Sequence, residues 1–308
     1  IQKHGMNIKG KEKNPQIDEV FVLLGKARYF DNRFIPALEA FNYILFKYPA
    51  SSNINLAKIW RAKTNLRLQN EDIVIKNLKR LIENYQLSNE DRAEASSTLA
   101  QAYINTKSLD SAITQLQSAS QLTKNKNFRG RLHFIEGQLY SVLGKKDSAN
   151  LAFDKVIALK RKTSRAYMIA AHLEKVKNFE FNNGDKIALE DFLESLETNR
   201  ENRPFLDKIH HQIANYHLQN KSDSLAIVYY NKSLRTNSED DQLTALNYQS
   251  LGDLNFDYSE YSLAGSYYDS TLLSLKENSK SFRAIKRKRD NLEDVIYFES
   301  IAQENDSI

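Results

Sequence analysis

The 308-residue sequence contains no cysteine, so it can form no disulfide, no thiolate nucleophile and no cysteine-ligated metal site. Glycine and proline are also scarce, at 9 and 4 residues, whereas a sheet protein of this length would need more of them in its turns. No apolar run approaches the roughly 18 residues that a membrane-spanning helix needs. We therefore predict a mainly helical fold without a membrane span.

The residues that are present are typical of a folded chain, with 41% apolar and 27% charged residues. The net charge is +5, and the densest basic run is Lys286–Arg289. This run is either a solvated helix face or a contact for nucleic acid or another anionic surface. The sequence begins at Ile1 without an initiator methionine and ends at Ile308, and we interpret it as part of a longer protein.

The stretch Arg131–Lys160 carries the clearest pattern, two apolar runs at helical spacing that are divided by a short turn. Gly137 and Tyr140 lie three residues apart in the first run, and Ala149 and Phe153 lie four apart in the second. Small residues let two antiparallel helices approach closely, and aromatic residues fill the space between neighbouring helix pairs. This pattern resembles a tetratricopeptide repeat, which is a helix–turn–helix unit.

The same pattern recurs along the chain at intervals of 37 to 39 residues. The anchors are a small second-helix residue and a larger one four positions later: Ala37 and Phe41, Val74 and Leu78, Ala112 and Leu116, Ala149 and Phe153, Ala188 and Phe192, Ala226 and Tyr230, and Ala264 and Tyr268. The period exceeds the tetratricopeptide value of about 34, which indicates slightly longer helices or links. We predict an all-α, right-handed α-solenoid of about seven tetratricopeptide-type repeats with a period of about 38, plus a C-terminal capping helix.

This pattern divides the chain into three parts: a polar leader over residues 1–16, the repeat array over 17–275, and a capping helix with its tail over 276–308. A single last helix is expected over about 281–303. One of its faces would carry Phe282, Ile285, Arg289, Leu292 and Ile296. Repeat arrays need an end with a polar outer surface, and this helix is predicted to provide it.

Repeat five departs from its neighbours through an unusually long loop over 177–184, after which Asp185 is expected to cap the second helix. Phe179 and Phe181 lie in this loop. They either fold back onto the core or form a protrusion that contacts a partner, since loops often carry function.

The sequence carries no motif for catalysis or for a bound cofactor. It has no phosphate-binding P-loop, no dinucleotide-binding glycine pattern and no nucleophile elbow. The six histidines lack the spacing of a zinc site, and Glu190, Glu194 and Glu197 are expected to form a solvated acidic stripe on one helix face. We therefore predict a protein that is not an enzyme and that has no catalytic residues, cofactor or metal.

First-helix residues line the inner surface of a tetratricopeptide array, so the position after each small residue is expected to face it. These positions are Lys26, Lys63, Gln101, Gln138, Asn215 and Asp253. They are either ordinary exposed polar positions or a groove for an extended peptide or partner segment. A nucleic-acid-binding helical repeat is an alternative, but the drift from lysine to aspartate argues against a recurring side-chain code.

Several stretches resemble one narrower family: Leu23–Tyr29, Ala37–Leu45, Lys58–Asn65, Asn202–Asp207, Ala264–Ser270 and Arg287–Ile296. They are similar to the PorW/SprE lipoproteins of the type IX secretion system of Bacteroidota. The resemblance implies a non-catalytic protein–protein interaction scaffold that serves protein secretion and, in gliding species, motility.

The same resemblance implies a location at the periplasmic face of the outer membrane, with protein partners in the outer-membrane translocon and the periplasmic ring and motor complex. It implies no nucleic-acid partner. No lipobox cysteine is present, so membrane attachment is expected only through a lipid anchor outside this segment. A general peptide-binding adaptor unrelated to secretion is the other alternative.

Overall fold

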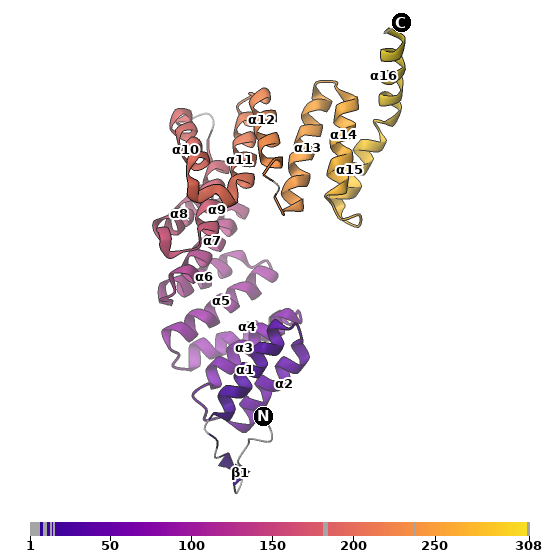
Figure 1. The fold of residues 1–308 in the computed structure, drawn as a ribbon. Helices are drawn as coiled ribbons and strands as arrows, with labels where there is room; N and C mark the ends of the chain where they lie inside the picture. Colours follow the sequence, from indigo (N-terminus) through magenta and orange to yellow (C-terminus); the bar gives the residue numbers. More distant parts are fainter. Residues whose placement is uncertain are drawn as a thin grey trace. The chain divides into compact units, whose positions relative to one another are not determined.

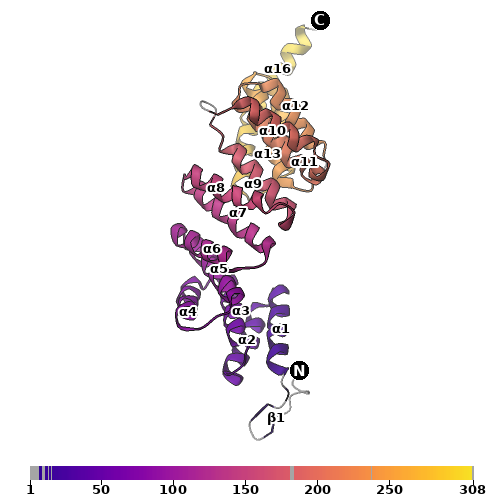
Figure 2. The same cartoon turned by 90° about the vertical axis from the view of Figure 1, so that its left-hand side faces the viewer.

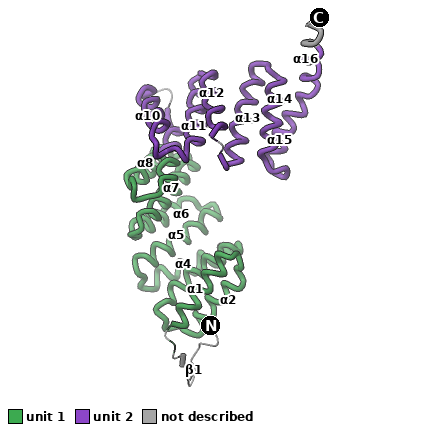
Figure 3. The backbone as a smooth tube through the Cα atoms, viewed as in Figure 1, with its two compact units in different colours: residues 1–171 green, residues 172–308 purple. Residues whose placement is uncertain are grey.

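The computed structural model describes residues 7–8, 11–12, 14, 16–180, 184–236 and 238–306. These residues form a short hairpin of β1 (Asn7–Ile8) and β2 (Lys11–Glu12), followed by the helices α1 to α16 (Figure 1). The chain divides into two compact units, residues 1–171 and residues 172–308 (Figure 3). We call them unit 1 and unit 2.

Unit 1 is a stack of helical hairpins, as Figures 1 and 2 show from two directions. The hairpins are α1 (Ile17–Phe30) with α2 (Phe34–Lys47), α3 (Ile54–Arg67) with α4 (Glu71–Asn84), α5 (Asn89–Asn105) with α6 (Leu109–Leu122), and α7 (Lys126–Val142) with α8 (Lys146–Ala158). The 3-10 turn η2 (Lys160–Lys162) leads into α9 (Arg165–Lys177), and the boundary between the units falls inside this helix.

Unit 2 continues with the same kind of hairpin. Its elements are α10 (Lys186–Thr198), η3 (Arg200–Phe205), α11 (Leu206–Gln219), α12 (Asp223–Leu234), α13 (Asp241–Asp257), α14 (Tyr261–Leu273), α15 (Lys280–Asp290) and α16 (Glu293–Asp306). The helical hairpins that the sequence pattern predicts are therefore confirmed in both units. The division into leader, array and cap stays a prediction.

In five of the hairpins, the size of the small first-helix residue matches the size of the large second-helix residue, whereas repeat six packs Ala214 with the large Tyr230 in one core cluster. The glycine–aromatic pairs are Gly25 and Phe41, Gly137 and Phe153, and Gly252 and Tyr268; a methyl group at any of these glycines would overlap the ring. Where the second helix carries the smaller Leu78 or Leu116, the first helix carries Ala62 or Ala100 in the same core cluster. In these five repeats, the match of volumes sets how closely the two helices pack.

The hairpin turns share one backbone conformation. Asn32, Gln69, Lys107, Gly144, Lys221 and Ser259 all have a left-handed backbone, with φ between 58° and 72°. In each turn, the next amide donates to the carbonyl five residues back; for Lys145 and Tyr140 this distance is 2.9 Å. The left-handed residue lies at the same place before the anchor in each of these repeats, so the turn keeps the second helix in register.

The predicted anchors of repeat five are wrong. Ala188 is exposed, whereas Leu193 and Leu196 are buried, so the register is shifted by one residue. The longer loop makes this shift possible, because α10 no longer follows α9 through the short turn that positions the other hairpins. Asp185 caps α10 as predicted, with its Oδ1 3.0 Å from the amide nitrogen of Ala188.

The predicted single C-terminal helix is divided into α15 and α16 at Asn291 and Leu292. The break has a packing reason. It allows Ile285 on α15 and Leu292 after the break to reach the same core cluster beside α14, and both side chains are buried. Ile296 on α16 then packs against Gly265, where a larger residue would displace it.

Candidate functional site

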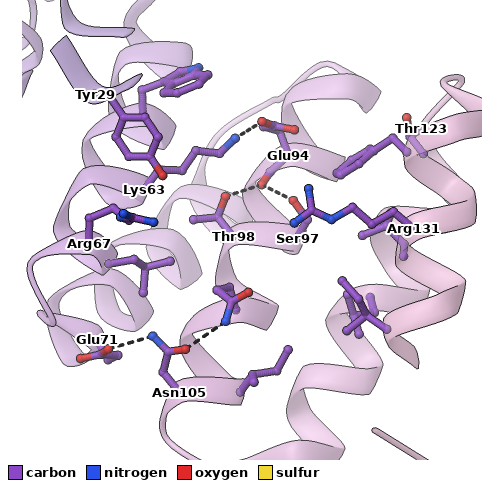
Figure 4. Close-up of a pocket in the computed structure, with 18 of the residues that line it drawn as sticks. Tyr29, Lys63, Arg67, Glu71, Glu94, Ser97, Thr98, Asn105, Thr123 and Arg131 are labelled. Carbon is purple, nitrogen blue, oxygen red and sulfur yellow. Dashed lines mark hydrogen bonds and ion pairs between the residues drawn. The ribbon is translucent and has the colours of Figure 1, made fainter. Parts of the chain in front are cut away.

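A groove of about 1350 Å³ lies on unit 1 (Figure 4). Most of its lining comes from the first helices α1, α3, α5 and α7. The first helices supply this surface because each second helix packs on their other side. The groove therefore crosses successive repeats and is not a cavity within one of them.

The floor of the groove is a polar stripe on α5. Its residues recur every three or four positions, which places them on one helix face: Glu94, Ser97, Thr98, Gln101 and Asn105. The opposite faces of α5 carry buried alanines, which allow close packing. Gln101 Nε2 donates to Asn105 Oδ1 at 2.9 Å, and Asn105 Nδ2 donates to Glu71 Oε1 at 2.9 Å. The stripe thus offers amide and hydroxyl groups to a ligand.

Aromatic residues form the N-terminal end of the groove. The Trp60 ring meets Tyr29 and Phe30 edge-on, with centroid distances of 5.5 and 5.7 Å. Phe30 is 71% exposed, so this cluster presents an apolar surface to solvent. Lys26 Nζ and Lys63 Nζ lie 5.0 and 4.5 Å from the Trp60 ring centroid, a geometry in which the ring attracts the ammonium charge.

The acidic side chains of the groove all have partners within unit 1. Glu94 forms an ion pair with Lys63, and Glu71 accepts the hydrogen bond from Asn105. Glu90 Oε1 accepts a 2.8 Å hydrogen bond from the Lys124 amide, and its Oε2 accepts one from Thr123 Oγ1 at 3.1 Å. Only Glu94 is paired with a cation of the described chain, whereas Glu71 and Glu90 are held by neutral donors and keep their negative charge.

Two arginines of the groove have no acidic partner among the residues that the structure describes. Arg67 lies over the Phe34 ring at 5.1 Å, and neither Arg67 nor Arg131 forms an ion pair with any described residue of the chain. Both are exposed. Figure 4 shows them pointing into the groove from opposite sides, toward α5. The groove therefore holds two cations without an ion pair to a described residue, together with two carboxylates, Glu71 and Glu90, that accept hydrogen bonds from neutral groups.

The residues that the sequence predicted to line one groove have different surroundings. Lys26 and Lys63 meet around Trp60, and Lys63 and Gln101 line the groove, while Gln138 is exposed on α7. Asn215 and Asp253 belong to unit 2.

Both unit 2 residues accept a tyrosine hydrogen bond from their own repeat. The distance from Tyr230 Oη to Asn215 Oδ1 is 2.6 Å, and that from Tyr268 Oη to Asp253 Oδ1 is 2.7 Å. Burial, followed by this bond to Asp253, raises the pKa of Tyr268.

Of the two aromatic residues in the loop of repeat five, the structure describes only Phe179. Phe179 is half-buried, and its ring packs against Gly184 within the same loop. Phe181 lies outside the described residues. Their proposed role in partner contact stays a prediction.

The expectation of a solvated acidic stripe on α10 is wrong for Glu197. Its Oε1 lies 3.0 Å from Lys232 Nζ and 3.2 Å from His210 Nε2, and its Oε2 accepts from Tyr229 Oη at 3.1 Å. Burial by itself raises the pKa of Glu197, but Lys232, His210 and Tyr229 together lower it. Lys232 is a full helix pair away in the sequence, so helix periodicity alone carries no sign of this contact.

A buried carboxylate, Glu136 on α7, was also missed by the sequence analysis. It is 1% exposed, and its Oε1 accepts from Gln117 Nε2 at 2.9 Å and lies 3.4 Å from Lys155 Nζ. Its Oε2 lies 3.0 Å from His133 Nδ1. Burial by itself raises the pKa of Glu136, but these partners lower it below its usual 4.5. The cluster joins α6, α7 and α8.

The basic run at 286–289 is largely neutralised within unit 2. Lys288 Nζ lies 2.7 Å from Asp253 Oδ1, Arg289 Nε lies 2.9 Å from Asp269 Oδ1, and Lys286 pairs with Asp290 four residues later on α15. The first two pairs attach α15 to α13 and α14. Most of the charge in the run is therefore used within the fold.

The described part of the chain contains no group of three or more histidine, aspartate or glutamate side chains arranged to hold a metal ion. Among the same residues, no helix combines the length and the apolar character required to cross a bilayer.

Repeated helical hairpins, matched small and aromatic residues and a recurring left-handed turn define a tetratricopeptide-type α-solenoid. No family model matches the chain, and no curated protein matches its sequence. Solved structures do share the fold. A tetratricopeptide repeat protein from Parabacteroides merdae has a TM-score of 0.60 at 13% identity, over 90% of this chain and 99% of that one.

Two further structures are similar in fold. The apo quorum sensor NprR from B. thuringiensis gives a TM-score of 0.58 at 10% identity, over 89% of this chain and 79% of that one. The human IFIT1 dimer with PPP-AAAA gives 0.53 at 18% identity, over 91% of this chain and 65% of that one. The all-α repeat fold predicted from the sequence is thus confirmed.

Proposed function

We propose that the chain is a non-catalytic scaffold that holds an extended segment of a partner protein in the groove of unit 1. The observation that carries this proposal is the groove itself, which crosses successive repeats and combines a polar floor with an aromatic end. An extended segment has backbone amides and carbonyls to satisfy, and the side chains of Gln101 and Asn105 can pair with them. The exposed Phe30 ring and the half-buried Trp60 ring suit an apolar side chain of the same segment.

Two arginines without an ion pair favour carboxylates at their positions along the bound segment. Glu94 is paired with Lys63, and hydrogen bonds from neutral donors hold Glu71 and Glu90 in place, whereas Arg67 and Arg131 have no ion-pair partner among the described residues. Arginine forms paired hydrogen bonds to carboxylates, and opposite charge across an interface selects the partner and speeds association. We therefore expect a partner segment with carboxylates on both sides of a central stretch and an aromatic residue near one end.

The experiment measures binding of a fluorescein-labelled acidic peptide that contains one phenylalanine by fluorescence anisotropy. Arg67→Glu and Arg131→Glu should each weaken binding about tenfold or more. The same charge reversal at Lys79, which is exposed on α4 outside the groove, serves as the matched control. Lys26→Glu together with Lys63→Glu should also weaken the complex. Equal affinities for the groove variants and the control would reject the groove as the binding surface.

We further propose that this scaffold works in the type IX secretion system, where it would link the outer-membrane translocon to the periplasmic ring and motor complex. This proposal rests on the resemblance of six stretches to the PorW/SprE lipoproteins. It includes a place at the periplasmic face of the outer membrane, with attachment through a lipid anchor outside this segment. Gliding motility would depend on it in species that glide.

Purification of the tagged full-length protein from native membranes tests the secretion role. Translocon and ring components should co-purify with the wild-type protein and be depleted with the Arg67→Glu, Arg131→Glu double variant. Recovery of other proteins alone would instead favour a peptide-binding adaptor unrelated to secretion.

Nucleic-acid binding, the other alternative, has less support because three of the four residues in the 286–289 run have acidic partners. Filter binding across a salt series distinguishes it, since phosphate contacts produce a steep decrease in affinity with salt.

A further inference from the structure

A second, smaller hollow of about 160 Å³ lies between α3 and α4 of repeat two. Lys58 and Arg61 line it from α3, and Arg80 lines it from α4. No aspartate or glutamate is among its lining residues; the others are amides, the Tyr85 ring and aliphatic side chains. Three cationic residues therefore line a small concave surface whose lining contains no acidic group.

The three cations have no anionic partner within the described part of the chain. Lys58 Nζ lies 3.8 Å above the Tyr85 ring centroid, and Arg61 Nη1 lies 3.3 Å from Asn42 Oδ1. Arg80 is exposed and forms no ion pair with a described residue. A ring face and an amide oxygen orient a cation, but neither supplies a full negative charge.

Arg61 distinguishes this hollow from a chance surface cluster. Its side chain is half-buried, and burial lowers the pKa of its guanidinium because desolvation disfavours the charged form. A partly buried charge without a counter-ion costs folding free energy unless a ligand provides one. Such groups, when they line a concave surface, are characteristic of binding sites.

We propose that the hollow between α3 and α4 binds a phosphate-type oxyanion through Lys58, Arg61 and Arg80. The guanidinium of Arg61 donates its paired N–H groups to two oxygens, and the ammonium of Lys58 is held over Tyr85 as a point charge. Arg80 closes the site from α4. The same chemistry is offered by free phosphate and by the head group of a phospholipid. The site is separate from the groove and does not depend on the function proposed for it.

Titration calorimetry with inorganic phosphate at constant ionic strength tests the site. We expect saturable binding to the wild-type chain and a rise in its Tm with phosphate concentration. Arg61→Gln should weaken binding about tenfold or more. Lys79→Gln removes the same charge from α4 outside the hollow and should leave the affinity unchanged.

Lys58→Gln removes a second cation of the hollow and should also weaken phosphate binding. Lys58 makes no hydrogen bond to a described residue, so this variant should still fold. Circular dichroism confirms that each variant is folded. Absence of saturable phosphate binding, or equal losses in Arg61→Gln, Lys58→Gln and Lys79→Gln, would overturn the proposal.

Flotation with phosphatidylcholine vesicles, with and without an anionic phospholipid, separates the two sources of the ligand. Association that requires the anionic lipid and is lost in Arg61→Gln assigns the site to a lipid head group. Phosphate binding without vesicle association assigns it to a soluble phosphate compound.

Discussion

Replacing Gly137 with alanine should destabilise unit 1, although alanine is the better helix former. A Cβ at Gly137 would lie 2.7 Å from Cδ1 and 2.8 Å from Cζ of Phe153, well inside ordinary van der Waals contact. The Phe153 ring is fully buried and packs on Phe134 at 5.8 Å, so it has little room to withdraw. Overpacking of this kind costs about 1–3 kcal/mol, against a gain of about 1 kcal/mol in helix propensity. Because the ring has little room to withdraw, we expect the upper part of that range, about 2–3 kcal/mol, and therefore a net loss of about 1–2 kcal/mol.

A double-mutant cycle isolates the packing contribution. Phe153→Leu alone should cost about 1–2 kcal/mol through the lost volume. Combined with Gly137→Ala, it creates the alanine–leucine pair that repeats two and three already use. The double variant should therefore lose at least about 1 kcal/mol less than the sum of the single losses.

Urea unfolding measures these free energies, and Trp60, the single tryptophan of the chain, reports on unit 1 by its fluorescence. Gln138→Ala, at the exposed neighbouring position, is the control and should stay within about 0.5 kcal/mol of wild type. The reasoning is refuted if Gly137→Ala is neutral or stabilising, or if the double variant loses the full sum.

Three further predictions concern a buried charge, the turns and the C-terminal helices. The folded-state pKa of Glu136 is lowered, so its stabilisation is present at neutral pH and is lost as the pH falls through that pKa. Glu136→Gln should flatten this acid dependence in urea unfolding between about pH 7 and about pH 3, and an unchanged pH profile would contradict the assignment. Gly144→Ala, at φ 72°, should cost about 1–2 kcal/mol, whereas Lys107→Gly at the equivalent turn position should gain up to about 1 kcal/mol. Thermal unfolding measures the stability of both turn variants. A Gly144→Ala variant as stable as the wild type would argue against a left-handed residue in this turn. Gly265→Leu should displace α16 and speed limited proteolysis near residue 291, while Ser266→Leu at the exposed next position should not.

Most of the helical hairpins could be predicted because each one carries the same short sequence pattern. Ala149 and the corresponding anchors of five other repeats are fully buried, because a small residue followed by a large one marks the contact line of a helix pair. The anchors predicted for repeat five were wrong because its longer loop replaces the turn that sets the register in the other repeats, and Ala188 is exposed. The prediction of one continuous C-terminal helix was wrong for another reason. Residues 281–303 contain no glycine or proline that would indicate a break.

The candidate site was predictable only in part. Helical periodicity places Lys63 and Gln101 on a first-helix face, and both line the groove. The periodicity contains no information on Glu94, which neutralises Lys63, or on Arg67 and Arg131, which stay unpaired. The cationic hollow at Arg61 was missed for the same reason, because its members come from two helices and have no motif in common.

The sequence by itself determined the helical hairpins, their period and the match of glycine to aromatic residues, since these features act between residues within one repeat. Only the tertiary structure decided which charges are paired. Lys288 reaches Asp253, and Lys232 reaches Glu197, across a full helix pair. Whether such residues meet depends on the angle and spacing between packed helices, which no short stretch of sequence specifies. Both proposed binding sites depend on cations that have no acidic partner in the described part of the chain, and these cations could be recognised only from the pairings in the folded chain.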